Sequence, residues 1–179
     1  VLMQLRKPRF LSLCLLIISL AVSGCAVSPQ KSAAHHTEVY FSPEGNISSR
    51  IIKAIDNSRL SIDIAIFDFT SQEIKASLEN AKKRGLKIRI IADSRQYKGA
   101  HSVVQLLIDS GFDVKIRRGK SRGIMHNKFA IFDKTLLFTG SYNWSDNAEF
   151  FNYENAIFIS DTEVIRKYQK EFDTILSRD

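Results

Sequence analysis

The chain has 179 residues, with 26 Lys and Arg against 19 Asp and Glu, which gives a formal net charge of +7. Its two cysteines, Cys14 and Cys25, both lie near the N-terminus, so the rest of the chain cannot rely on a disulfide and must be stabilised by its core. About 150 residues follow the N-terminal segment, which suits one domain with a single core. No internal repeat is present.

Residues 1–24 have the pattern of a lipoprotein-type signal peptide. A basic start precedes the apolar stretch 11–22, which is shorter than the roughly 20 residues that span a bilayer. The sequence Val-Ser-Gly-Cys at 22–25 resembles a bacterial lipobox. We therefore expect lipidation of Cys25 and a protein anchored in a bacterial cell envelope, facing the periplasm or the exterior. An uncleaved anchor and an ordinary signal peptide are the alternatives.

The next segment, residues 25–37, is small and polar and indicates a flexible tether between membrane and domain. It contains His35 and His36, which we interpret as solvated side chains, with metal binding as the alternative. The catalytic domain is predicted to span residues 38–179.

From residue 38 onward, strand and helix patterns alternate. The predicted elements are a strand (38–41), a helix (47–57), a strand (60–69), a helix (71–84), a strand (86–92), a helix (102–110), a short strand (113–116), two paired strands (128–132 and 136–139), a strand (153–159) and a closing helix (162–177). Ser71 is a suitable N-cap, and Gly85 and Gly111 are suitable helix ends. The order predicts a single α/β domain, with a mixed β-sheet flanked by helices on both faces.

Polar residues interrupt the two paired strands in a fixed pattern: His126, Lys128 and Asp133, then Ser141 and Asn143. Side chains two residues apart on a strand share a face, so a cation lies beside an imidazole that can act as nucleophile or as acid and base. Neutral donors repeat this spacing on the second strand. A cation and several donors that converge suit the oxygens of a phosphoryl group, which predicts phosphodiester chemistry.

This pattern resembles the HKD motif of the phospholipase D superfamily. The likeness extends over residues 38–178 to the small bacterial endonucleases of that superfamily, which carry one copy of the motif. It includes 40–45, 54–56, 81–85 and 154–156. The resemblance implies a phospholipase D-like α/β sandwich and a phosphodiesterase that uses neither metal nor other cofactor. The sequence shows no compact metal-ligand spacing.

The same resemblance implies roles for single residues. His126 would form a covalent phosphohistidine, Lys128, Ser141 and Asn143 would hold the phosphate oxygens, and Glu154 would orient His126. Asp133 is counted among the catalytic residues because it belongs to the motif, although its position after an apolar run suggests a supporting role. A second imidazole would have to come from another subunit, so we expect a homodimer with the active site at its interface.

A strongly basic segment leads into His126. Its cations are Lys115, Arg117, Arg118, Lys120 and Arg122, and the nearby acid is Asp113. Such a run favours a polyanion, and we assign these side chains to binding nucleic acid, DNA in the first place and RNA in the second. A solvated loop is the alternative, as is a face against anionic lipid.

Other residues are weaker candidates. Trp144 is assigned to substrate binding, where it and Tyr142 would stack on bases, and packing in the core is an equal alternative. Asp63 and Asp68 lie on opposite faces of one strand, so either could approach the site. The sequence Asp-Ser-Arg at 93–95 follows a strand, and strand ends often line sites. His101 is expected to be exposed.

The sequence is compatible with three functions. The first is a metal-independent, non-specific endonuclease that cuts DNA or RNA. The second is a phospholipase D that acts on lipid head groups, which the expected membrane anchor favours. The third is a non-catalytic receptor in DNA uptake, against which the intact motif argues.

Overall fold

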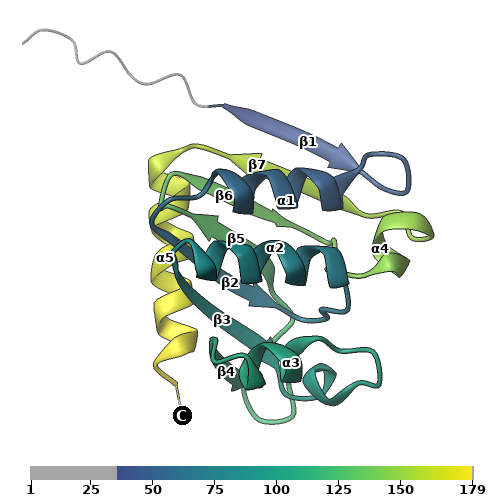
Figure 1. Cartoon of the computed structure of the whole chain (residues 1–179), viewed down its shortest axis with the longest axis vertical. Helices are drawn as coiled ribbons and strands as arrows, with labels where there is room; N and C mark the ends of the chain where they lie inside the picture. The colour runs from purple at the N-terminus through teal and green to yellow at the C-terminus, as the bar shows by residue number, and fades with distance from the viewer. Residues whose placement is uncertain (1–35, 179) are drawn as a thin grey trace, which may run out of the picture. The chain divides into compact units, whose positions relative to one another are not determined.

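The computed structural model describes residues 36–178, and these form one seven-stranded mixed sheet in the order β1-β7-β6-β5-β2-β3-β4 (Figure 1). The strands are β1 (Thr37–Phe41), β2 (Ser61–Ile66), β3 (Lys87–Asp93), β4 (Asp113–Arg117), β5 (Lys128–Phe132), β6 (Leu136–Gly140) and β7 (Asn155–Ile159). The helices are α1 (Ile47–Asn57), α2 (Gln72–Lys83), the 3-10 turn η1 (Gln96–Lys98), α3 (Val104–Asp109), α4 (Asp146–Phe150) and α5 (Thr162–Leu176). The strand pairs β2–β3 and β3–β4 are parallel, and the other pairs are antiparallel.

The predicted α/β sandwich is confirmed, because helices cover both faces of this sheet. Alternation along β2 separates two cores: Ile62 and Ile64 pack with α1, α2 and α3, whereas Ala65 packs with α5. Figure 1 shows α1 and α2 side by side over the sheet and α5 at its left. Every residue of β5 is buried, so this strand forms the centre of the fold.

Three details of the sequence prediction differ from the structure. The strand expected at 60–69 ends at Ile66, and the chain then turns so that Phe69 forms an isolated bridge with Trp144. The helix α4 was not predicted, because five residues are too few to show a helical period; Ser145 caps it by accepting from the N–H of Ala148. The strand expected at 153–159 begins at Asn155.

A buried ion pair holds α5 against the sheet. Asp63 is 3% exposed and accepts two hydrogen bonds from Arg89, at 2.7 and 2.6 Å, and one from Gln169, at 2.9 Å. Because both carboxylate oxygens have charged or amide donors, burial of this acid is compensated. Asp63 therefore holds α5 against the sheet. Of Asp63 and Asp68, which the sequence left open as site residues, Asp63 has this structural role.

The first strand begins at Thr37, one residue before the predicted domain boundary, and His36 already hydrogen-bonds to Ser160. The predicted signal peptide (1–24), Cys25 and the tether as far as His35 lie outside the described residues. Within the described residues, no helix combines the length and the apolarity needed to cross a bilayer.

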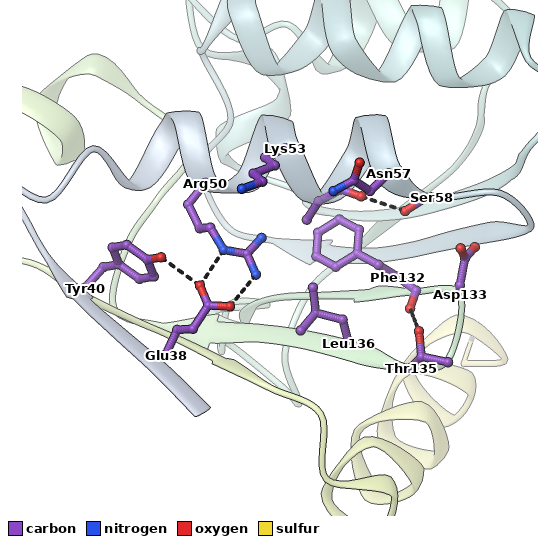
Figure 2. A pocket seen from close by; sticks show the side chains of 11 residues that line it. Glu38, Tyr40, Arg50, Lys53, Asn57, Ser58, Phe132, Asp133, Thr135 and Leu136 are labelled. Atoms are coloured by element: carbon purple, nitrogen blue, oxygen red, sulfur yellow. Dashed lines mark hydrogen bonds and ion pairs between the residues drawn. The ribbon is translucent and has the colours of Figure 1, made fainter. Parts of the chain in front are cut away.

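An ion pair ties β1 to α1. Arg50 donates from Nε and Nη2 to the two oxygens of Glu38, at 2.6 and 2.8 Å, and the Tyr40 hydroxyl donates to Oε2 at 2.7 Å. These three side chains line a pocket of about 340 Å³ together with Asp133. Figure 2 shows them at one side of this pocket and Asp133 at the other. Chiefly because of the Arg50 hydrogen bonds, and despite partial burial, the pKa of Glu38 is lowered to about 2.

We predict that Glu38→Gln destabilises the domain at pH 7 but not at pH 2. The folded-state pKa of Glu38 lies below its ordinary value of 4.5, so its contribution is complete above about pH 4.5 and is lost as the pH falls through about 2. The loss at pH 7 should be about 1 kcal/mol, because partly exposed pairs are screened. Urea unfolding at both pH values measures it, with Glu44→Gln as the exposed control. Equal destabilisation at both pH values would contradict the prediction.

Candidate active site

Most of the polar residues singled out in the sequence lie at one end of the sheet, and strand direction brings them there. Since β5 is antiparallel to β2 and β6, the start of β5 lies beside the ends of β2 and β6, and the start of β7 lies beside the end of β6. This end receives His126 from the segment before β5 and Lys128 from its first residue. Asn143 comes from the segment after β6, and Glu154 from the segment before β7.

The candidate catalytic pair consists of His126 and Lys128. The imidazole Nε2 lies 3.3 Å from the ammonium Nζ, which also donates to the carbonyl oxygen of His126 at 3.1 Å. Phe67 supports both side chains: its ring centroid lies 4.5 Å from that of His126 and 5.0 Å from the Lys128 Nζ. His126 is exposed, whereas Lys128 is only 8% exposed. An imidazole open to solvent therefore has a largely buried cation as its neighbour.

Two acids offset part of the effect of burial on the pKa of Lys128. Burial lowers the pKa of Lys128, and the charges of Glu154 and Asp68 oppose this effect. Burial likewise raises the pKa of Asp68, opposed by the N–H of Phe69 and by the charge of Lys128. Asp68, two residues after the end of β2, is thus the acid of this region whose charge acts on Lys128.

Asn143 has an unused polar atom at this end of the sheet. Its side-chain oxygen is buried and has no hydrogen-bond partner among the described residues. A buried polar atom without a partner costs about 1–3 kcal/mol, and the amide oxygen and nitrogen are interchangeable in their assignment. The side-chain amide of Asn143 therefore has unused hydrogen-bonding capacity in this structure.

Ser141 and Glu154 bind each other instead of facing a ligand and His126. The Ser141 hydroxyl donates to Glu154 Oε2 at 2.5 Å and accepts from the backbone and side-chain N–H groups of Asn155. Glu154 also accepts from Asn152 at 3.1 Å, and no hydrogen bond joins it to His126 within the described chain. The single hydroxyl proton of Ser141 is thus donated to Glu154, and the expected His126–Glu154 contact is not formed between the described residues.

A basic hollow of about 600 Å³ opens beside His126. Its cations are Arg118 and Lys120 from the predicted segment and Arg178 from the chain after α5. Arg117 also borders it, but its guanidinium donates to the carbonyl oxygens of Ile175 and Leu176 and so holds the end of α5.

Two cations of the predicted set, Lys115 and Arg122, do not border the basic hollow. Lys115 is exposed on the edge strand β4, and Arg122 lies at the tip of the following turn, where its carbonyl oxygen accepts from Arg95. The predicted substrate-binding group is therefore only partly brought together. Metal ligands are not gathered either: within residues 36–178, no three His, Cys, Asp or Glu side chains come together.

Comparison with known families gives the affiliation of this fold and site. The family model described as "Cardiolipin synthase, PLD-like domain" matches residues 51–176, which is well over half of the chain. The chain belongs to the phospholipase D-like family. The resemblance inferred from the HKD motif is thereby confirmed.

Individual phospholipase D-like relatives are similar over most of the chain. Mitochondrial cardiolipin hydrolase of Mus musculus is 35% identical over 127 residues, which are 71% of this chain and 57% of the mouse protein. Phospholipase D of Rickettsia conorii is 35% identical over 128 residues, 72% of this chain and 63% of that protein. The chain thus spans less than two thirds of the length of these two relatives.

Two solved structures share the fold. NucT from Helicobacter pylori has a TM-score of 0.73 and 30% identity, covering 79% of this chain and 96% of NucT. Nuc from Salmonella typhimurium, a phospholipase D family member, has a TM-score of 0.73 and 29% identity, covering 79% of this chain and 94% of Nuc.

The HKD aspartate of this phospholipase D-like chain lies away from the site, which corrects its assignment as a catalytic residue. Asp133 follows β5 at the opposite end from His126, roughly 20 Å away at about 3.3 Å per residue. Its carboxylate accepts from the backbone N–H groups of Arg59, Leu60 and Ser61 at 2.7 to 2.9 Å. Burial raises the pKa of Asp133, but these donors outweigh it and leave the pKa below its ordinary value.

Trp144 does not stack on substrate, so its assignment to substrate binding is wrong. The ring is 0% exposed and packs edge-on against Phe69, with centroids 5.0 Å apart. Tyr142 is also buried, and its hydroxyl donates to Glu149 at 2.7 Å. Both aromatic side chains alternate with the exposed Ser141 and the half-buried Asn143, so they face the core.

Sequence reasoning missed Phe67 and Arg178. Phe67 continues the apolar run of β2, and nothing in its identity distinguishes a ring that supports His126 from one in the core. Arg178 lies at the end of the chain, and only the packing of α5 brings it to the basic hollow. No local pattern could have indicated either contact.

We predict that Asp133→Asn lowers the free energy of unfolding by about 1–3 kcal/mol, since charge-assisted bonds to three N–H groups are weakened. Asn tolerates the positive φ of 50° at this position, so backbone strain does not add to the effect. Activity per folded molecule should stay within about twofold of wild type, because the site is at the other end of β5. Urea unfolding measures the change, with the exposed Asp113→Asn as control; unchanged stability would contradict it.

Proposed function

We propose that this chain is a metal-independent phosphodiesterase, and specifically an endonuclease that cuts DNA, with RNA as a further substrate. The observation that carries the proposal is the imidazole of His126, held 3.3 Å from the Lys128 ammonium and open to a hollow lined by four further Lys and Arg residues. A nucleophile beside a cation, next to a basic surface, suits a phosphodiester within a polyanion.

The chemistry needs two imidazoles. In the first step a ring nitrogen of His126 attacks phosphorus, the bond from phosphorus to the leaving oxygen breaks, and a second imidazolium gives that oxygen its proton. In the second step the second imidazole, now neutral, takes a proton from water. The water oxygen attacks phosphorus, and the phosphorus–nitrogen bond of the phosphohistidine breaks, which frees His126. Lys128 and Asn143 would stabilise the charge on the phosphoryl oxygens.

The second imidazole supports a homodimer as part of the proposal. The described chain offers one imidazole at this end of the sheet, and an exposed aromatic patch lies nearby: Phe41, Phe150, Phe151 and Tyr153 are 64%, 61%, 76% and 95% exposed. The segments that carry them meet at Ser42, whose hydroxyl donates to the carbonyl oxygen of Asn152. Large exposed apolar groups of this kind mark interaction surfaces, and a two-fold pair buries the same patch from both subunits.

Nucleic acid is favoured over lipid by charge and by length. The basic hollow offers several cations, as a polyanion requires. The chain covers nearly all of NucT and Nuc but 57% of the mouse cardiolipin hydrolase, which agrees with the resemblance to small single-motif endonucleases. The names of the curated relatives favour the alternative, a phospholipase D that acts on phospholipid head groups.

Localisation remains part of the proposal as well. A lipidated Cys25 would anchor the protein in a bacterial cell envelope, with residues 25 to about 36 as the tether that lets the domain reach its substrate.

We predict that residues 26–179 nick supercoiled plasmid in excess EDTA and that His126→Asn lowers the rate at least about a thousandfold, because the nucleophile is lost. Agarose gels of timed samples measure both rates. His101→Asn makes the same change at an exposed histidine that does not border the basic hollow, so it is the matched control and should retain activity.

Absence of nicking by a folded wild-type dimer would overturn the endonuclease proposal. Release of head group from phosphatidylcholine or cardiolipin vesicles, dependent on His126, would then establish the lipid alternative. Binding of DNA without cleavage, unaffected by His126→Asn, would instead indicate a receptor.

We predict that wild-type and His126→Asn subunits, refolded together in equal amounts, retain about a quarter of the wild-type activity, because only one dimer in four then contains two His126 residues. Independent sites would retain about half, and that outcome would contradict a shared active site. Sedimentation of the mixture checks that the species is a dimer. Tyr153→Glu should shift it toward the monomer, since it places a charge in the aromatic patch.

A further inference from the structure

A fully buried carboxylate binds the backbone directly before His126. The chain from Met125 to Lys128 is called the catalytic segment below. Asp93, the last residue of β3, is 0% exposed. Its Oδ1 accepts from the backbone N–H groups of Arg95 and Gln96, at 2.8 and 3.2 Å, and its Oδ2 accepts from the N–H of Met125 at 2.9 Å. One side chain therefore joins the turn after β3 to the residue that precedes His126.

The two oxygens of Asp93 have different tasks. The Oδ1 bonds are local and close the turn that leads into η1, as aspartate commonly does at the end of a strand. The Oδ2 bond spans 32 positions of sequence and reaches Met125, which is 4% exposed and packs in the core beneath α5. Only the second bond fixes the catalytic segment.

The segment between β4 and β5 has few other anchors. Within it, the Arg122 carbonyl oxygen accepts from the Arg95 guanidinium at 3.0 Å. Just before it, the carbonyl oxygen of Arg117, the last residue of β4, accepts from the Ser94 N–H at 2.8 Å. Both lie further from His126 than Met125 does. The Met125 N–H is thus the last such anchor in the described chain before the exposed imidazole.

We propose that Asp93 is a positioning residue for His126. By holding the Met125 N–H it sets the direction in which the chain enters β5, and this direction places the imidazole against Phe67 and beside Lys128. The inference rests on the proposed phosphodiesterase function, in which His126 is the nucleophile. Displacing a nucleophile by about 1 Å can reduce a rate by about a hundredfold.

The variant Asp93→Ser separates the two tasks. A serine hydroxyl can still accept from an N–H group two or three residues on, which preserves the local turn, but it is one atom shorter and does not reach Met125. We expect kcat for cleavage of a fluorescent oligonucleotide to fall about 10- to 100-fold. We expect KM to stay within about threefold, because the cations of the basic hollow remain.

A second readout does not depend on substrate. Hydrogen exchange at the Met125 amide should become faster in Asp93→Ser, while amides at the centre of β5 keep their protection. Asp63→Asn is the matched control, because Asp63 is also a buried carboxylate with three donors but binds Arg89 and Gln169 beneath α5. It should lose stability while retaining kcat and slow exchange at Met125.

Several results would overturn the proposal. One is a folded Asp93→Ser with wild-type kcat; another is an equal loss of kcat in Asp63→Asn, which would show general destabilisation. If Asp93→Ser does not fold, Asp93→Asn replaces it, since it keeps the side-chain volume. If wild type cleaves no oligonucleotide, the proposed function fails, and exchange at Met125 alone decides whether Asp93 holds the segment.

Discussion

The register of β5 between β2 and β6 is the constraint on which the candidate site depends. Lys128 pairs with Ile66 and Phe129 with Thr139, and all five residues of β5 are buried. A slip of one residue would move every side chain to the other face and would bury Phe129 in place of Lys128 among the groups at the site. The apolar identity of the strand therefore fixes the position of a cation. The cost of burying that cation is reduced by Glu154, Asp68 and the ring of Phe67.

Local patterns predicted much of this arrangement. The alternation of strands and helices indicated the α/β sandwich, Ser71 marked the start of α2, and the spacing of His126 and Lys128 placed both on one face. These predictions succeeded because each depends on residues close in sequence. The contacts of Arg178 and Phe67 depend on strand order and on the packing of α5, which no local period contains. Trp144 shows a further limit: a large aromatic ring has the same identity whether it stacks on a ligand or fills a core.

The basic residues around the hollow divide into two groups once the fold is known. Arg117 is bound to the last carbonyl oxygens of α5, where a cation also complements the helix dipole, while Arg118, Lys120 and Arg178 remain around the basic hollow. The same segment therefore closes the fold and provides the charged surface. At the other side of His126, Ser141 and Glu154 satisfy each other, which leaves Asn143 as the neutral group with unused hydrogen-bonding capacity.

The distance between the two ends of the HKD motif affects how genetic data on this family should be interpreted. A screen that scores growth or total activity in cells measures the amount of folded protein multiplied by the rate per molecule. Substitutions of Asp133 reduce the first quantity by releasing three N–H groups at the start of β2, whereas substitutions of His126 reduce the second. Substitutions at either position would lower the score, although they act on different quantities. Invariance within one short motif can thus arise from two separate selective pressures, on abundance and on turnover.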